Sequence, residues 1–361
     1  LELYKKFICS LYDHMIYLER NWEVYDTRTN NHYLSDLLGF YYLLNFFENL
    51  GANNLKNKIL WCKKEFLKEL DKQILPDGSS YEGSVTYHVL VAEIVYFFKI
   101  LAEKNVLIEQ GDYLAKLQKK FESICEFASC FYLDSKDFIT IGDNDSGKVV
   151  AGLPKRFLLN QKEKHENLSE VKHFNYFGVS VFKSKKLNVT LRHHAYNKLQ
   201  PSGHFHNDFL SITLSINGIP IIIDPGSYVY TASNYWRNYF RSSQVHNGFY
   251  IDGLEPIRLD NNLFGLEIPA GFPCTESDAF ESSHELYKDL GLKAHRKVSF
   301  DKDSFGNITG IIVNDSWKKR GDSRFDNLTS TWTLTLHPQI KVIRQGESSR
   351  DLASYDHIKL A

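Results

Sequence analysis

The 361 residues are enough to bury a substantial core and suggest two domains. Lys and Arg total 43 against 44 Asp and Glu, so overall charge predicts neither nucleic-acid nor membrane-surface binding, and any attraction for an acidic partner must be local. No apolar run reaches the length expected of a membrane-spanning helix. Aromatic residues make up 14% of the chain, which suits core packing and also stacking against sugar rings.

Residues 1–133 predict helices, because apolar side chains recur at helical spacing, as in Leu34, Leu37, Leu38 and Tyr41. The predicted helices cover about residues 3–15, 34–50, 55–74, 85–104 and 113–131. Helical hairpins of this kind build bundles, superhelices or toroids.

Residues 134–172 carry a weaker pattern and are expected to connect the helices to a second domain at 173–361. Strands are predicted at about 177–182, 187–192, 209–216, 219–224, 310–313, 328–336 and 340–343. Asn217-Gly218, between two apolar runs, predicts a tight hairpin. Helices first and strands second favour two segregated layers over a parallel α/β sheet.

The β-type half contains a cluster of residues that bind metals or move protons. In an extended strand, His204, His206 and Asp208 would share one face, and Asp224 or His246 is available as a further ligand. Two His and one Asp are an acceptable zinc trio.

The predicted hairpin makes this metal site difficult to build. A two-residue turn at Asn217-Gly218 pairs Asp224 with Ser211, five residues from His206, and at roughly 3.3 Å per residue that is too far for one ion. The site forms only if the chain curls back before Phe209. Spacing alone leaves metal binding and structural hydrogen bonding as open alternatives.

Two polar motifs lie in the helical half. Asn30-Asn31-His32 precedes an apolar helix, so either asparagine suits a helix N-cap. A polar loop at residues 77–88 leads into another helix, and its Tyr87 taken alone suits a packed aromatic.

All these motifs occur in one order: Asn-Asn-His, Glu-Gly-Ser with Tyr-His, Gly-Asp-Asn-Asp-Ser-Gly, Gly-His-x-His-x-Asp, Asp-Pro-Gly and Arg-Ser-x-x-x-His-Asn. Over about residues 27–255 the sequence resembles the heparinase II/III-like polysaccharide lyases, relatives of certain alginate and heparan lyases. The resemblance implies an incomplete (α/α) toroid followed by an antiparallel β-sandwich, and a periplasmic or secreted protein. Members have more toroid helices, so we expect the chain to be truncated at its N-terminus.

The resemblance also implies β-elimination at a uronic acid of an acidic polysaccharide or oligosaccharide. Asn31 and His32 would contact the uronate carboxylate, and Tyr87, with His32 as a second candidate base, would move protons at C5 or O4. His204 would arrive from the β-half to complete the site, and Tyr235 matches a second tyrosine of the family.

Further residues have implied supporting roles. Arg237, Arg241 and Glu82 are the expected substrate-binding residues, and the two arginines are also candidates for making Tyr87 more acidic. A structural zinc ion is implied on His206, Asp224 and His246, and Asp208 would then orient a histidine.

Two other functions fit parts of this pattern. His-x-His-x-Asp also opens the motif of metallo-β-lactamase-type zinc-dependent hydrolases, but there a His follows the Asp, and here that residue is Phe209. A non-catalytic polysaccharide-binding or polysaccharide-assembly protein could keep the scaffold. Such a protein has no need of the set Asn31, His32, Tyr87 and His204. Low basic charge favours a carboxylate substrate over a heavily sulfated one.

Overall fold

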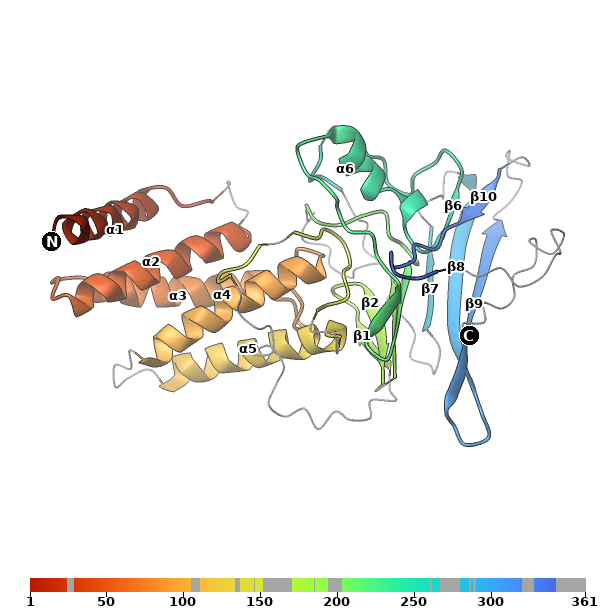
Figure 1. Cartoon of the computed structure of the whole chain (residues 1–361), viewed down its shortest axis with the longest axis horizontal. Coiled ribbons are helices and arrows are strands. Elements are labelled where there is room, and N and C mark those ends of the chain that lie inside the picture. Colours follow the sequence, from red (N-terminus) through yellow and green to blue (C-terminus); the bar gives the residue numbers. More distant parts are fainter. Residues whose placement is uncertain are drawn as a thin grey trace. The chain divides into compact units, whose positions relative to one another are not determined.

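The protein was studied as a computed structural model, which divides into two compact units. The helical unit comprises Leu1–Glu82, Tyr87–Ser129 and Ser146–Asn160, and the sheet unit comprises Gly83–Thr86, Cys130–Asp145 and Gln161–Ala361 (Figure 1). The structure describes residues 1–24, 29–104, 111–133, 137–145, 147–151, 171–184, 186–193, 203–259, 262–266, 280–285, 287, 290–319 and 328–341. The predicted connection at 134–172 is therefore divided between the two units.

Five long helices occur in the first part of the chain, and each confirms a predicted one. They are α1 (Glu2–Arg20), α2 (Asn31–Asn49), α3 (Lys56–Gln73), α4 (Val85–Lys104) and α5 (Gly111–Phe131). In α2 and α3, apolar residues that repeat at helical spacing are the ones the helix buries, whereas α1 buries only Met15.

Stacked aromatic rings join three of these helices. Phe98 of α4 stacks on Tyr41 of α2 with ring centroids 4.4 Å apart, and on Phe66 of α3 with centroids 3.7 Å apart. Each such pair contributes about 0.5–1.5 kcal/mol beyond the burial of its apolar surface. The rings therefore hold α2, which carries Asn31 and His32, against α3 and α4.

Helix α4 corrects one expectation from the sequence. By length and composition, Val85–Lys104 is apolar enough to cross a membrane, the one such helix in the part of the chain that the structure describes. However, 61% of its most apolar window is buried inside the structure, as in the core helix of a folded domain.

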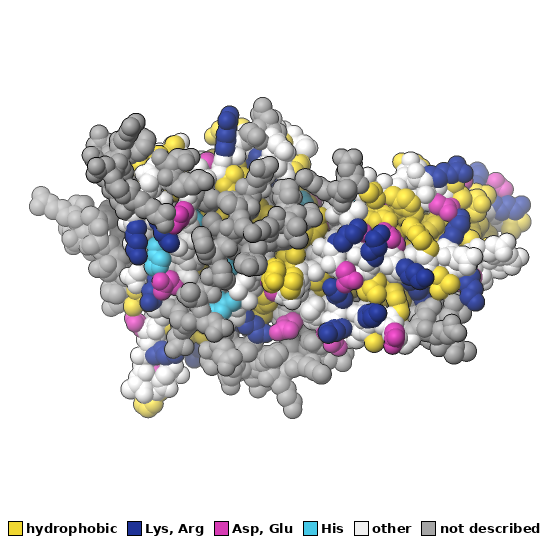
Figure 2. All heavy atoms as spheres, turned by 180° about the vertical axis from the view of Figure 1, so that it is seen from behind, with side chains coloured by type: hydrophobic (Ala, Val, Ile, Leu, Met, Phe, Trp, Pro, Cys, Tyr) yellow, Lys and Arg dark blue, Asp and Glu magenta, His cyan; other side chains and the backbone are white. Residues whose placement is uncertain are grey.

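The surface of the helical unit mixes charges of both signs with apolar side chains (Figure 2). Several of its lysines pair with carboxylates, as Lys58 does with Glu19 at 2.6 Å and Lys120 does with Asp71 at 2.9 Å. Exposed pairs of this kind add little stability, but they balance charge locally.

The sheet unit contains a five-stranded antiparallel sheet in the order β1-β2-β3-β4-β5. Its strands are β1 (Val171–Phe174), β2 (Val179–Lys183), β3 (Leu187–Arg192), β4 (Ile212–Ile216) and β5 (Ile219–Ile222). The predicted hairpin between β4 and β5 is confirmed, because Asn217 and Gly218 have φ of 51° and 73°. Positive φ at both central residues is the signature of the type I′ turn.

The described residues of this unit also form two smaller sheets. One is antiparallel in the order β7 (Phe280–His284), β8 (Leu292–Lys302) and β9 (Ile308–Lys319), and the other pairs β6 (Phe249–Ile251) with β10 (Ser330–Trp332). Val298 of β8 belongs to the same hydrophobic cluster as Leu191 and Leu214 of the large sheet. The larger and the three-stranded sheet thus share a core.

The predicted strand at 310–313 lies within β9, and the predicted strand at 328–336 is longer than β10, which it contains; β1, β6, β7 and β8 were not predicted. In β8 the alternation of apolar residues is broken by a buried arginine, Arg296. Its guanidinium pairs with Asp315 of β9 at 2.7 Å. Of the predicted strand at 340–343, residues 340 and 341 are outside any strand and residues 342–343 lie outside the described residues.

Candidate active site and metal centre

The segment that carries His204 and His206 turns sharply before β4. Leu210 has a positive φ of 61°, and its N–H donates to the carbonyl of Arg192 at 2.9 Å. The N–H of Ser211 donates to the carbonyl of Asp208 at 3.0 Å, which closes the turn. The chain therefore reverses within residues 208–211, at Phe209 itself and not before it as expected.

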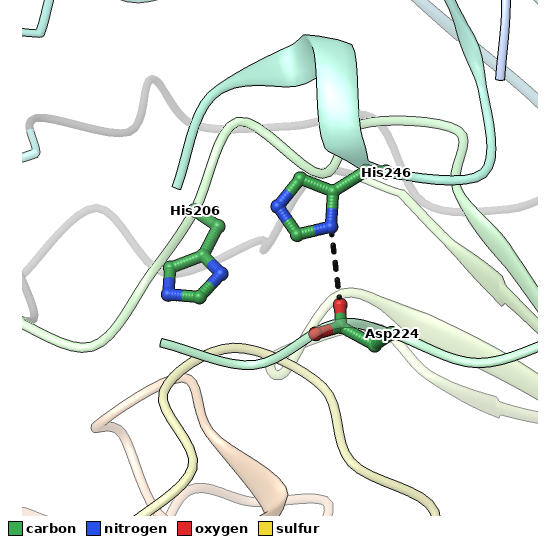
Figure 3. Close-up of side chains that lie close together, drawn as sticks. All are labelled: His206, Asp224 and His246. Atoms are coloured by element: carbon green, nitrogen blue, oxygen red, sulfur yellow. Dashed lines mark ion pairs between the residues drawn. The ribbon is translucent and has the colours of Figure 1, made fainter. Parts of the chain in front are cut away.

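His206, Asp224 and His246 come together in the sheet unit. Each offers one potential ligand atom, these atoms lie within 4.8 Å of one another, and all three residues are buried. Asp224 follows β5, and His246 follows the short 3-10 helix η2 (Ser243–Val245) (Figure 3). His246 Nδ1 lies 3.3 Å from Asp224 Oδ2.

The hydrogen bonds of this cluster fit a bound cation. His206 Nε2 lies 2.8 Å from Asp143 Oδ1, so Nε2 carries the proton and Nδ1 keeps its lone pair. Among the described residues, His206 Nδ1 and both ring nitrogens of His246 are buried without a hydrogen-bond partner. Each unsatisfied polar atom of this kind costs about 1–3 kcal/mol. Two imidazoles and a carboxylate are a donor set that suits zinc, and an ion bound there would take one ring nitrogen from each histidine.

Electrostatics keep the Asp224 carboxyl ionised. Burial acts to raise its pKa, but the charge of the nearby His246 outweighs burial and holds the pKa below its ordinary value. The N–H of Gly226 also donates to Asp224 Oδ1 at 2.8 Å. Asp224 is thus an anionic ligand candidate that is already oriented.

A second buried carboxylate, Asp143, connects this cluster to His204. It accepts hydrogen bonds from His204 Nδ1 and His206 Nε2, each at 2.8 Å, and from both terminal nitrogens of the Arg237 guanidinium. Burial acts to raise the pKa of Asp143, but the hydrogen bonds from the two histidines and Arg237 hold it well below the ordinary value. One ionised carboxylate therefore fixes two imidazoles and a guanidinium.

Aromatic side chains lie next to the His204 ring. Its ring centroid lies 6.5 Å from that of Tyr230 and 6.2 Å from that of Phe264, and its side chain is 14% exposed. The N–H of Asp143 also donates to the carbonyl of His204 at 3.1 Å. Gly142 allows this approach, because a Cβ there would lie 2.7 Å from that carbonyl oxygen.

In the helical unit, the two asparagines before α2 have different partners. Asn30 is the N-cap, and its side chain accepts from the N–H of His32 at 3.0 Å. Asn31 instead donates to Glu82 through its backbone N–H at 2.9 Å and through Nδ2 at 2.8 Å. The capping alternative therefore applies to Asn30. The exposed His32 ring pairs with Glu23 at 2.5 Å.

The two tyrosines differ in exposure. Tyr87, in the first turn of α4, is 8% exposed, whereas Tyr235, in α6 (Asn234–Phe240), is 67% exposed. Tyr235 lines a cavity of about 460 Å³ together with Asn234, Asn238, Tyr239, Ser242, Gln244, Glu255 and Leu259. Asn31, His32 and Tyr87 belong to the helical unit, and His204 and Tyr235 to the sheet unit. Their joint action on one sugar stays a prediction.

Several residues expected at the substrate are instead buried and hydrogen-bonded to protein. Arg237 holds Asp143, and Arg241 donates to the carbonyls of Leu263 at 3.0 Å and Asn262 at 2.9 Å. A guanidinium with five donors suits such loop carbonyls. Glu82, with 2% exposure, faces Asn31.

Asp208 also differs from its expected role. It was expected to orient a histidine, but it forms a buried ion pair with Arg192, Oδ2 to Nε at 3.2 Å. That arginine in turn donates to the carbonyls of Phe177 at 2.7 Å and Gly83 at 3.3 Å. By holding Arg192, Asp208 therefore helps to fix the backbone at Phe177 and Gly83.

Asp143 is the central residue that the sequence did not identify. It lies in the motif Gly142-Asp143-Asn144-Asp145, which contributed to the family resemblance and fell in the expected connection, but no role was predicted for Asp143. The signal in the sequence was a pair of aspartates next to a glycine, in a segment with little helical or strand periodicity.

Both halves of the chain are similar to known protein families. The model of the heparinase II/III-like C-terminal domain matches residues 166–355, and that of the heparinase II/III N-terminus matches residues 2–134. No curated protein matches the chain.

Three solved structures share the fold. The heparinase III BT4657 gene product is 17% identical with a TM-score of 0.64, covering 88% of this chain and 50% of its own. A crystal structure of heparinase III is 17% identical with a TM-score of 0.59, covering 82% and 48%. A heparan sulfate lyase HepC mutant from Pedobacter heparinus is 16% identical with a TM-score of 0.63, covering 91% and 51%. The chain spans about half the length of these proteins and belongs to the heparinase II/III-like family.

Proposed function

We propose that this protein is a polysaccharide lyase that cleaves a uronic-acid-containing acidic polysaccharide by β-elimination. The C5 proton of a uronate is weakly acidic, because the charge left by its removal spreads onto the adjacent carboxylate. An enzyme must therefore stabilise that charge, remove the proton with a positioned base and protonate the departing O4.

Residues of both units have suitable chemistry for these steps. The amide of Asn31 and the imidazole of His32 neutralise the uronate carboxylate. Tyr87 removes the C5 proton or protonates O4, with His32 as the second candidate base. His204 completes the set, and Tyr235 offers a second phenol. The proposal requires that these residues act on the same sugar unit.

The pairing of His204 with Asp143 is the observation that carries the proposal. A buried carboxylate on Nδ1, at 2.8 Å, fixes the ring and its tautomer, which leaves Nε2 as the atom suited to proton transfer. A protein that only binds polysaccharide has no need to fix a partly exposed imidazole in this way.

His206, Asp224 and His246 are the proposed zinc ligands. A zinc ion bound there would have a structural role, since it would fix His206 and thereby the loop that carries His204. We further infer that the helices belong to an incomplete (α/α) toroid and that the sheets form an antiparallel sandwich.

A carboxylate-bearing chain with little sulfation fits the substrate best, because Lys and Arg do not exceed Asp and Glu in number. The titles of two structural neighbours name heparinase III and heparan sulfate lyase. Heparan-type chains are therefore the first polymers to test, followed by glucuronans, alginate and bacterial capsules. A periplasmic or secreted location accompanies this proposal.

Product analysis in water enriched in heavy oxygen tests the reaction type. Elimination yields an unsaturated uronate at the new end and takes up no solvent oxygen. Hydrolysis, the reaction of a zinc-dependent hydrolase, would place heavy oxygen in the product. Binding without any fragment would instead support a polysaccharide-binding or polysaccharide-assembly role.

A further inference from the structure

Glu82 and Asn31 form a buried pair within the helical unit, with exposures of 2% and 4%. Glu82 Oε1 accepts from the backbone N–H of Asn31 at 2.9 Å, and Oε2 accepts from Nδ2 at 2.8 Å. We infer that Glu82 is a positioning residue that fixes which face of the Asn31 amide meets the substrate. The inference rests on the proposed lyase function, in which Asn31 neutralises the uronate carboxylate.

The chemistry of the pair determines the orientation of the amide. An ionised carboxylate only accepts hydrogen bonds, so the Asn31 atom that faces Glu82 must be the NH₂ nitrogen and not Oδ1. This nitrogen has two hydrogens, and Glu82 takes one of them. The direction of the second N–H is then set by the plane of the amide. Without the carboxylate, a half-turn of the amide would place its oxygen where a donor is needed, and that oxygen would repel a uronate.

The surroundings hold both partners in place. On one side, Gln73 Nε2 donates to the carbonyl of Asn30 at 3.0 Å. On the other, the Tyr81 hydroxyl donates to the carbonyl of Thr29 at 2.7 Å, and the N–H of Tyr81 donates to the carbonyl of Gln73 at 3.0 Å. Hydrogen bonds thus connect the segments before α2 and before α4 on both sides of the pair. These bonds restrict movement of Asn31.

Glu82 also lies where its negative charge is stabilised. Its carboxylate accepts from the first backbone N–H of α2, where the positive end of the helix dipole favours an anion. Hydrogen bonds to a charged acceptor are about twice as strong as neutral ones. The result is a strongly held amide in a protein interior, as a donor to a developing negative charge requires.

The first test replaces Glu82 by Gln, which keeps the shape and removes the charge. Gln can accept only through one oxygen, and its own NH₂ competes with that of Asn31. We expect kcat to fall by about 10-fold to 10²-fold, somewhat less than the loss of a whole charge-stabilising donor, with a smaller change in KM. Glu93→Gln is the matched control, because Glu93 is equally buried in the same unit and accepts from the N–H of Val149 at 3.0 Å. It should change stability but not kcat.

The second test exchanges the two groups. Asn31→Asp alone sets two carboxylates against each other and should lower the melting temperature clearly. Adding Glu82→Gln restores one donor and one acceptor, so the double variant should regain much of that stability. It should stay inactive, because the group facing the substrate is now a carboxylate. A merely structural pair would instead recover activity together with stability.

The outcomes separate this inference from the function on which it rests. An active wild type with a wild-type kcat in Glu82→Gln would overturn the inference alone. Recovery of activity in the Asn31→Asp, Glu82→Gln double variant would overturn the inference together with the role proposed for Asn31, and would leave the lyase reaction itself standing. A wild type without lyase activity on any uronate polymer would overturn the proposed function and this inference with it.

Discussion

The Nδ1 atom of His204 lies 2.8 Å from Oδ2 of Asp143, a carboxylate with no exposed surface. The other carboxylate oxygen lies 2.8 Å from Nε2 of His206, one of the proposed zinc ligands. A single side chain therefore connects the candidate catalytic imidazole to the candidate metal centre. We expect any displacement of His206 to displace His204 as well, because both rings contact this carboxylate.

The Asp143→Asn variant tests that connection. The change leaves the buried Arg237 without its charged partner, which should cost about 3–5 kcal/mol of folding stability. It should also lower kcat/KM by about 10-fold to 10²-fold, because Asn keeps only one acceptor oxygen and so sets an NH₂ donor against one of the two histidines. Urea denaturation and a lyase assay measure the two effects.

A matched control for this variant lies in the same unit. Asp315→Asn breaks another buried ion pair, in which Arg296 lies 2.7 Å from Asp315. This control should lose similar stability and keep its kcat/KM. Equal activity losses in both variants would mean that Asp143 acts only through stability.

Tyr87→Phe removes only a hydroxyl from a side chain that is 8% exposed. If Tyr87 moves a proton in the reaction, kcat should fall by about 10² or more, with the circular dichroism spectrum unchanged. Tyr96→Phe, in the same helix, controls for the loss of a phenol hydroxyl. Wild-type turnover in the Tyr87 variant would remove this residue from the mechanism.

His206→Ala should release the proposed zinc ion. Metal analysis of the purified wild type is expected to show about one equivalent of zinc, and the variant should show far less. The melting temperature of the variant should fall, since the ion no longer stabilises the folded chain. His173→Ala removes a histidine outside the cluster, one whose Nδ1 lies 2.8 Å from the Ser180 hydroxyl, and should keep the metal. A metal-free wild type would refute the zinc proposal.

We predict that the protein loses folding stability in mild acid because of its buried His88. Burial lowers its pKa from 6.5 to about 4, although a hydrogen bond to the Ile124 carbonyl opposes this. The folded chain therefore takes up this proton less readily than the unfolded chain. The stabilisation is complete above pH 6.5 and is lost as pH falls toward 4, by on the order of 3 kcal/mol.

His88→Gln provides the comparison for this effect. Its amide can accept from the N–H of Ser80 and donate to Ile124, as the two ring nitrogens do at 3.0 Å each. Gln does not titrate, so the unfolding free energy of the variant should change less between pH 6.5 and 4 than that of the wild type. Denaturant titrations at several pH values measure this slope. Parallel pH curves would assign the acid sensitivity to other groups.

The sequence predicted local features well. The helices follow from apolar spacing, and α4 agrees to the residue at both ends, Val85 and Lys104. The β4–β5 hairpin follows from Asn217-Gly218, whose residues adopt positive φ readily. The resemblance named His206, Asp224 and His246 as ligands, and the structure brings them together.

The contacts of two carboxylates with residues far away in the sequence could not be predicted from local patterns. Asp143 precedes His204 by 61 residues, and Glu82 follows Asn31 by 51. No periodicity or turn signal connects residues so far apart. Buried arginines were misjudged for a related reason, since the sequence does not show whether a guanidinium meets solvent or a buried carboxylate. Arg237 meets the buried carboxylate of Asp143, and Arg241 meets the carbonyls of Leu263 and Asn262.

The most direct measurement is ultraviolet absorbance from a new C4–C5 double bond when the chain is incubated with a panel of uronate polysaccharides. The account predicts a steady rise with at least one polymer, abolished in Asn31→Ala and in His204→Ala, one variant from each unit. An absorbance that stays flat across heparan-type chains, glucuronans, alginate and bacterial capsules would contradict it, as would a rise that both variants retain.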